Sequence, residues 1–292
     1  MPSRADNAKG VILMLLSMFV FSAVDTQAKF LTATIDPLQV VWMRQMGLFI
    51  GVVILLLWRG GIVLKTARIG LQLGRGACAA LSASLFIIGV SYVPLADAVA
   101  VTFIAPLLVT IMAALLLGEY VGIHRWTAVL IGFAGTLVII RPGFDSFHPA
   151  LLLPFSAAFL FAGRQIISRF LSGIDRTETT VAYTAIASTI LLSLPLPFVW
   201  VNPQTQSEFL LILGMASMAA MGELLVIKAL EIALAVVVSP MQYTIIIWSS
   251  FYGFMVFDQL PDIYTLGGTA IIILSGLYTL HRERLRTRQK QN

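Results

Sequence analysis

Long runs of apolar residues, separated by short polar stretches, follow one another along the whole chain. Runs such as VVILLLW (52–58) and TIMAALLLG (110–118) lack the alternation of apolar and polar residues that a membrane β-strand requires. A helix needs roughly 20 apolar residues to cross a bilayer core of about 30 Å. The pattern therefore predicts an all-α, polytopic membrane protein with ten transmembrane helices. The expected spans are residues 10–32, 38–58, 72–93, 95–117, 122–140, 149–171, 178–200, 208–229, 232–257 and 262–281.

Composition excludes a soluble domain. Of the 292 residues, 59% are hydrophobic and 11% are charged, and the mean hydropathy is +0.93. A soluble domain has about 45–50% apolar and about 25% charged residues. Ten spans use most of the chain, so almost no extramembrane domain is expected. The first run continues from Val11 to about Leu31, beyond the length of a signal peptide, and is interpreted as a retained helix.

The basic residues predict how the helices are inserted. With the N-terminus in the cytoplasm, nearly all of the 19 Lys and Arg residues fall on the cytoplasmic side, and only Lys29 and Arg141 fall on the other. The positive-inside rule predicts this asymmetry, so both termini are expected in the cytoplasm. The basic tail HRERLRTRQK (281–290) is interpreted as a stop signal that contacts membrane lipid, and no nucleic-acid partner is expected.

An internal repeat divides the chain into two halves. Residues 19–31 (FVFSAVDTQAKFL) align without a gap to residues 159–171 (FLFAGRQIISRFL). We predict a first repeat at 1–144 and a second at 145–292, each with five helices. Because five is odd, the second half enters the membrane in the opposite sense. Such inverted repeats place the substrate site at mid-membrane between the halves.

The later segments resemble a known family. PLADAVAVTFIAPLLVTIMAALLLGE (94–119), followed by RW and GFAGTLVIIRPG, is similar to the signature of the EamA family of the drug/metabolite transporter superfamily. Arg44 in VVWMRQM matches an arginine common in that family's second helix, and SPMQYTIIIWSSFYGFMVFDQLPD (239–262) repeats the signature in the second half. Asp258 departs from the Gly-Glu usual there.

The resemblance implies transport without ATP through ten helices, with both termini cytoplasmic. It also implies a central cavity lined by the helices at 95–117 and 232–257. Members of the family move amino acids, S-adenosylmethionine, riboflavin, nucleotide-like compounds or drugs, so the resemblance leaves the substrate and the direction of transport open.

Four ionisable residues are expected at membrane depth, where a charge is costly and marks a functional site. Asp25 and Arg44 are predicted at a similar depth in the outer half, and Arg164 and Glu223 share a depth in the inner half. Each pair could bind substrate, and either carboxylate could exchange a proton that couples transport to the proton gradient. The alternative is that each pair only holds helices together.

The helix at 232–257 carries Gln242, Tyr243, Trp248 and Tyr252 as further candidate substrate-binding residues. Aromatic rings with one amide suit a flat, conjugated ligand, although such rings also belt membrane interfaces. Pro106 and Pro240 are candidate gating residues, because proline frees a carbonyl and bends a helix. Proline is also common in membrane helices without such a role.

No enzymatic chemistry is expected. His124, His148 and His281 fall at helix ends on different sides, there is one cysteine, and no phosphate-binding loop or nucleophile elbow is found. The sequence therefore predicts a secondary transporter of the bacterial inner membrane with a small-molecule substrate, no metal and no cofactor. A membrane-embedded enzyme and a channel or scaffold are the competing classes. The oligomeric state is left open, a homodimer included.

Overall fold

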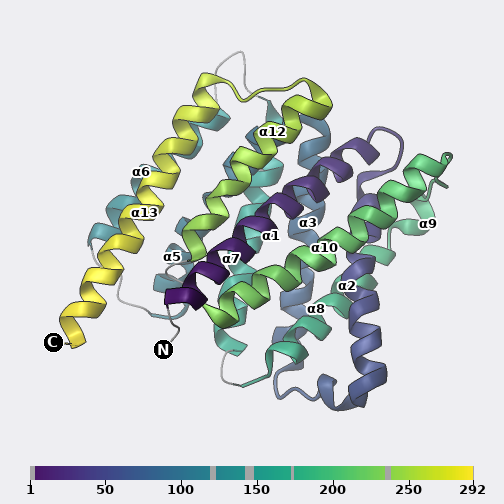
Figure 1. The fold of residues 1–292 in the computed structure, drawn as a ribbon, viewed down its shortest axis with the longest axis horizontal. Coiled ribbons are helices and arrows are strands. Elements are labelled where there is room, and N and C mark those ends of the chain that lie inside the picture. The colour runs from purple at the N-terminus through teal and green to yellow at the C-terminus, as the bar shows by residue number, and fades with distance from the viewer. Residues whose placement is uncertain (1–3, 119–122, 142–147, 172–173, 234–237, 292) are drawn as a thin grey trace.

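The chain folds into a bundle of α-helices in the computed structural model, which describes residues 4–118, 123–141, 148–171, 174–233 and 238–291 (Figure 1). Across these residues no strand is formed, and the prediction of an all-α membrane protein is confirmed. In hydrocarbon every backbone amide needs a partner within its own segment, which helices supply.

The longer helices are α1 (Arg4–Leu31), α2 (Pro37–Arg59), α3 (Ile69–Tyr92), α4 (Leu95–Thr102), α5 (Ala105–Leu116), α6 (Ile123–Ile140), α7 (Leu152–Leu171), α8 (Thr177–Ser193), α10 (Gln206–Ile232), α12 (Ile245–Phe257) and α13 (Ile263–Gln291). Short helical segments are η1 (Gly60–Leu64), η2 (Pro149–Leu151), α9 (Leu196–Val199) and η3 (Ser239–Thr244).

Six helical stretches in the described part of the chain are both long and apolar enough to cross a membrane. They are Asp6–Leu31, Pro37–Arg59, Ile69–Tyr92, Leu95–Leu116, Pro149–Leu171 and Gln206–Ile232. Trp126–Ile140 and Ile263–Tyr278 are shorter apolar helices. The protein is therefore a multi-pass membrane protein.

Prolines set helix ends that the hydropathy pattern did not resolve. The span expected at 178–200 is wrong at its end, because α8 stops at Ser193 and α9 is a separate turn that begins beside Pro195. Proline lacks the amide hydrogen that a continuing helix needs. The last helix runs to Gln291, ten residues beyond the expected end of its span at 281.

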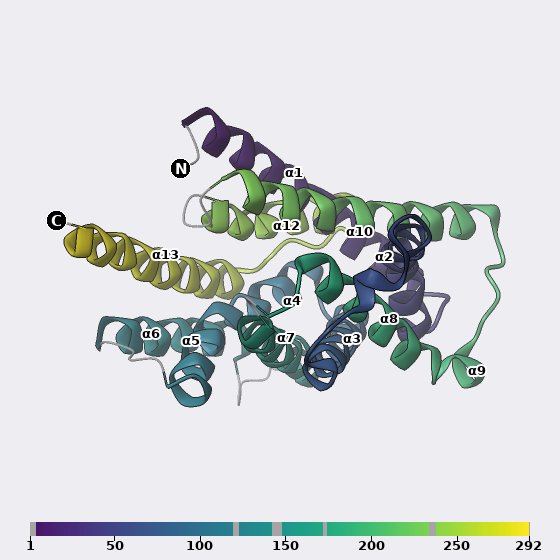
Figure 2. The same ribbon diagram turned by 90° about the horizontal axis from the view of Figure 1, so that it is seen from below.

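The helices form two layers (Figure 2). One layer holds α1, α10 and α12, and the other holds α3, α5 and α7, with α4 between them. The packing of each layer has a counterpart in the other. α1 packs along α10 as α7 packs along α3, α2 packs on α10 as α8 packs on α3, and α1 packs on α12 as α7 packs on α5. Other close pairs include α2 with α8, α2 with α3, α4 with α12, and α6 with α13.

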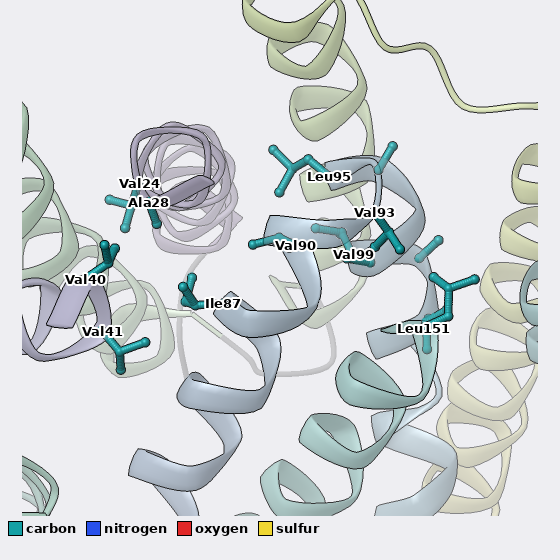
Figure 3. Packing of buried hydrophobic residues seen from close by; sticks show 14 of the residues in the cluster. Val24, Ala28, Val40, Val41, Ile87, Val90, Val93, Leu95, Val99 and Leu151 are labelled. Atoms are coloured by element: carbon teal, nitrogen blue, oxygen red, sulfur yellow. The ribbon is translucent and has the colours of Figure 1, made fainter. Parts of the chain in front are cut away.

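An apolar cluster holds α1, α2, α3 and α4 together (Figure 3). Val24, Val40, Ile87 and Leu95 contribute one side chain from each of these helices, and all four are fully buried. Dispersion contacts between close-packed side chains stabilise such a cluster inside lipid, because burial from water no longer drives helix association there.

Polar contacts between loops define the two ends of the bundle. At one end, here called the Asp36 end, Thr34 donates a hydrogen bond to Glu208 and the Gln39 side chain bonds the backbone of Val201. Arg141 and Asp262 form an ion pair of 2.7 Å at the same end.

The opposite end, here called the Arg59 end, joins α2 and η1 to α8 and the segment before it. Arg59 forms an ion pair with Glu178 at 2.6 Å, and Thr66 donates a hydrogen bond to Asp175. The hydroxyl of Thr66 and the side-chain amide of Gln72, both donating to the carboxylate, hold the pKa of Asp175 below its ordinary value.

Candidate functional site

Asp25 and Arg44 form a buried ion pair between α1 and α2. Arg44 Nη1 lies 3.2 Å from Asp25 Oδ1, and the Asp25 side chain is 6% exposed. The Asp36 side chain accepts a hydrogen bond from the Leu38 amide and begins α2 at Pro37, which sets the turn that brings the two helices side by side. The expected pairing of Asp25 with Arg44 is confirmed.

Arg164 and Glu223 do not form the expected pair. Within the described residues their side chains are not within 4.0 Å of each other, because Arg164 lies on α7 and Glu223 on α10, in opposite layers. The expectation of direct pairing, based on equal depth, is wrong for this reason. The two groups are near enough to attract each other electrostatically, and the Arg164 guanidinium lies 4.7 Å from the ring centroid of Phe161.

Arg75 lies in the same part of the bundle, although the sequence pattern counted it on the cytoplasmic side, at the start of the span expected at 72–93. α3 begins at Ile69 rather than at 72, so Arg75 lies on the second turn of the helix and inside the bundle. Its Nε donates to Ser168 Oγ on α7 at 2.8 Å, and its Nη1 donates to Thr184 Oγ1 on α8. Arg75 and Arg164 also interact electrostatically with Glu223. A charge placed shortly after the start of an apolar run was the signal that could have identified it.

The aromatic residues of α12 pack within the bundle. Trp248 and Tyr252 both contact Phe19 of α1, with ring centroids 5.0 and 5.6 Å apart. Trp248 and Tyr252 therefore lie on a common face of α12 that packs against α1. The Trp248 Nε1 group is buried and has no hydrogen-bond partner in the described part of the protein.

Gln242 and Tyr243, the two candidate residues in η3, have different surroundings. The Tyr243 ring packs edge-to-face on Phe103, the residue that follows α4, at 5.2 Å between ring centroids, and its hydroxyl lies against Gly276 of α13. Gln242, the preceding residue, is exposed. Tyr243 thus joins α4 and α13, and Gln242 does not share that contact.

Both candidate gating prolines lie where a helix is interrupted. Pro106 is in the first turn of α5, and Phe103 and Ile104 separate α5 from α4. Pro240 is in the first turn of the 3-10 segment η3, which leads into α12. The prediction that proline breaks these helices is confirmed, because proline favours the first turn and disfavours a helix interior.

Lys29 ties helices together at the Asp36 end, a role that the sequence did not indicate. Its Nζ donates to the Val93 carbonyl at 2.6 Å and to Gln259 Oε1 at 3.0 Å, and it lies 5.1 Å from the ring centroid of Phe257. Nearby, Thr265 donates a hydrogen bond to Asp97 at 2.8 Å. α4 packs against α12 here, whereas α5 has no comparable contact with α12 among the described residues.

Metal ligands do not gather in the part of the chain that the structure describes: no group of three His, Cys, Asp or Glu residues there could hold a metal ion. The chemistry that this arrangement supports is charge pairing, hydrogen bonding and aromatic contact between helices. Charged groups held between the layers of an apolar bundle are typical of a membrane transporter.

Comparison with known proteins identifies the family. Residues 8–141 match the model of the EamA-like transporter family. A riboflavin transporter of Vibrio cholerae is 31% identical over 291 residues, which cover 97% of each chain. The chain therefore belongs to the EamA-like transporter family, and it is a transporter rather than an enzyme.

Other relatives carry different names. An S-adenosylmethionine uptake transporter of Rickettsia prowazekii is 27% identical, covering 94% of this chain and 93% of that protein. A pseudopaline exporter of Pseudomonas aeruginosa is 26% identical, covering 91% and 94%. A crystal structure with 18% identity shares the fold at a TM-score of 0.64 and covers 97% of this chain and 99% of its own.

Proposed function

We propose that this protein is a secondary active transporter that carries a vitamin-like, nucleoside-like or amino-acid-like solute across the bacterial inner membrane by alternating access. Riboflavin and S-adenosylmethionine are the leading candidate solutes. The observation that carries the proposal is the end-to-end similarity to a riboflavin transporter. The similarity to an S-adenosylmethionine uptake transporter supports the second candidate.

The proposed architecture is ten transmembrane helices in two inverted halves, residues 1–144 and 145–292. The boundary between the halves lies outside the described residues. The matched packing of the two layers supports this division, since exchanging α1, α2, α10 and α12 for α7, α8, α3 and α5 maps one set of contacts onto the other. Inverted repeats produce such a pattern.

The Arg59 end is proposed to face the cytoplasm, with both termini there. It carries Arg59, Lys65, Arg68 and Arg176, and Figure 1 shows both termini on the lower side of the molecule, where α2 leads into α3. Retention of basic loops in the cytoplasm gives this orientation.

The solute is proposed to bind between the two layers. Asp25, Arg44, Arg164 and Glu223 would supply polar contacts, and Gln242, Tyr243, Trp248 and Tyr252 would supply aromatic and amide contacts. The packing of Trp248 and Tyr252 on Phe19 gives a rigid aromatic surface that suits a flat ring system. Tyr243, which packs between α4 and α13, would act mainly by holding these helices in place.

Gating is assigned to the helix breaks at Pro106 and Pro240. With α4 packed on α12 and α5 apart from α12, movement about Pro106 would change access from the Arg59 end while leaving the Asp36 end closed. A proton exchanged at Asp25 or Glu223 would couple this movement to the proton gradient.

Counterflow in proteoliposomes tests the proposal. Vesicles loaded with unlabelled riboflavin or S-adenosylmethionine should transiently concentrate the labelled compound from outside, because a carrier exchanges solute across the membrane. Empty liposomes and vesicles loaded with an unrelated sugar are the controls. A channel would give equilibration without trans-stimulation, and absence of counterflow with either solute would count against the proposed substrates.

Export of amino acids, drugs or other metabolites is the second candidate function. The similarity to a pseudopaline exporter favours it. Direction follows the gradient rather than the fold, so measuring flux in inside-out and right-side-out vesicles under an imposed proton gradient separates import from export.

A further inference from the structure

Arg75 and Arg164 lie on neighbouring helices of one layer, and neither forms an ion pair with a carboxylate in the part of the chain that the structure describes. α3 and α7 pack side by side over much of their length. Within the described residues, no carboxylate oxygen lies within 4.0 Å of either guanidinium group, in contrast to the Asp25–Arg44 pair. Among the described residues, Arg75 donates hydrogen bonds to the neutral hydroxyl groups of Ser168 and Thr184 alone, and Arg164 Nε is buried without a hydrogen-bond partner.

One carboxylate faces these two arginines from the opposite layer. Glu223 on α10 attracts both guanidinium groups without touching Arg164. Counted over the described residues that interact here, two positive charges and one negative charge leave one positive charge uncompensated. An uncompensated charge away from water is costly unless a partner neutralises it, and an anionic ligand between the layers would supply that partner.

We propose that Arg75 and Arg164 form an anion-binding subsite for a carboxylate or phosphate group of the transported solute. The inference rests on the proposed function and adds a charge requirement to it, which S-adenosylmethionine meets through its carboxylate and uncharged riboflavin does not. The solute would carry at least one anionic group, placed toward α3 and α7, with the rest of the molecule extending toward α10 and Glu223.

The surroundings of both arginines suit this role. The guanidinium of Arg164 lies over the Phe161 ring, and stacking on an aromatic face holds the planar group in one orientation. Ser168 and Thr184 accept hydrogen bonds from Nε and Nη1 of Arg75 and hold its side chain in place. The side chain therefore loses less conformational entropy when an anion binds. A guanidinium fork that is held in place can donate two parallel hydrogen bonds to a carboxylate or phosphate.

Cys78 provides a native reporter for the subsite, because it is the one cysteine in the sequence. A methyl group built on the Cα of Gly163, next to Arg164, would stand 3.9 Å from Cys78 Sγ. The thiol is partly exposed and interacts electrostatically with Arg164. A ligand bound at the two arginines should therefore slow alkylation of Cys78.

The test measures the alkylation rate of Cys78 by N-ethylmaleimide in the purified full-length protein, by mass spectrometry. Two pairs of probes differ in one anionic group: riboflavin 5′-phosphate against riboflavin, and S-adenosylmethionine against its methyl ester. In at least one pair, the anionic member should give half-protection at a concentration lower by about tenfold, the value expected for a charge-assisted hydrogen bond. The pair that responds identifies the anion as phosphate or carboxylate.

Variants assign the preference to the two arginines. Arg164→Gln and Arg75→Gln should remove the advantage of the anionic probe, and Arg164→Lys, which keeps the charge, should retain part of it. Arg169→Gln is the matched control, because Arg169 is an exposed residue on the same helix, and it should leave the preference unchanged.

Three results would overturn the subsite: no probe protects Cys78, both members of each pair protect equally, or the preference survives in Arg164→Gln. If Arg164→Gln does not fold, the comparison of anionic and non-anionic probes in the wild-type protein and in Arg164→Lys decides whether the subsite exists. The binding test is independent of transport. Counterflow without an anion preference overturns the subsite alone, whereas an anion preference without counterflow overturns the proposed transport of these solutes.

Discussion

Asp25 and Arg44 neutralise each other inside the bundle, and removing one of them leaves the other as a buried charge. Asp25→Asn or Arg44→Gln alone should lower the free energy of unfolding by roughly 3 kcal/mol, the cost of breaking a buried ion pair. The double variant should lose less free energy of unfolding than the two single variants lose together. Urea or thermal unfolding in detergent micelles measures the three differences.

The exposed ion pair of Arg59 and Glu178 is the control for this comparison of single and double variants. The Arg59 and Glu178 side chains are 54% and 41% exposed, so Arg59→Gln and Glu178→Gln should each cost less than about 1 kcal/mol. If the Asp25 and Arg44 variants are no more costly than these, the buried pair does not stabilise the bundle.

Glu223 lies in the layer opposite two arginines that it attracts, and it is one of the two carboxylates proposed to exchange a proton during transport. Glu223→Gln keeps the shape of the side chain but cannot ionise. It should abolish net uptake driven by a proton gradient while exchange of labelled solute remains measurable. Glu231→Gln, an exposed position on the same helix, should leave both activities intact. Undiminished proton-driven uptake in Glu223→Gln would remove Glu223 from coupling.

The residues of the site were only partly predictable from sequence. Asp25 and Arg44 were recognised as a candidate pair because both charges lie within apolar runs. Their equal depth was enough to predict the contact, because α1 and α2 are consecutive in the chain and lie side by side. Equal depth failed for Arg164 and Glu223, because the sequence does not say that α7 and α10 belong to opposite layers. Arg75 was missed because it lies at the start of the span expected at 72–93, where the positive-inside pattern counted it as a cytoplasmic charge and not as a charge inside the bundle.

At the scale of helices, α6 and α13 are held together by a close approach of small residues. An ideal Cβ on Gly135 would stand 2.9 Å from the Gly268 carbonyl oxygen and 3.0 Å from side-chain atoms of Ile271 and Ile272. Gly135→Leu should therefore separate the two helices and lower the free energy of unfolding by about 1–3 kcal/mol, as expected for overpacking.

Gly267 gives a matched control on α13, because nothing lies within 4 Å of its ideal Cβ. Gly267→Leu should leave the melting temperature unchanged or raise it, since leucine favours a helix more than glycine does. Equal melting temperatures for Gly135→Leu and Gly267→Leu would show that the α6–α13 contact tolerates a larger spacing.

Helix positions were easier to predict than helix interruptions. The apolar runs gave most spans within a few residues, because the thickness of the hydrocarbon core fixes their length. Pro195 and Pro197 lie where α8 ends and α9 begins. The hydropathy pattern did not predict this interruption, because hydropathy averages over residues whose backbone chemistry differs. The break before Pro106 was predictable because proline acts locally.

For the whole molecule, the account depends on two halves that enter the membrane in opposite directions and form two matching layers. The sequence suggested the halves through the similarity of 19–31 and 159–171. It did not indicate that each layer combines helices from both halves, as when α7 joins α3 and α5. Such long-range partners depend on packing in three dimensions, which a repeat in the sequence does not specify.

Thiol labelling of single cysteines measures this topology directly. In a Cys78→Ala background, Arg68→Cys and Arg176→Cys should resist a membrane-impermeant maleimide in intact spheroplasts and react after permeabilisation. Thr34→Cys and Asn202→Cys should react in both. Residues 68 and 176 labelling from opposite faces would contradict the inverted arrangement and the substrate site proposed between the layers.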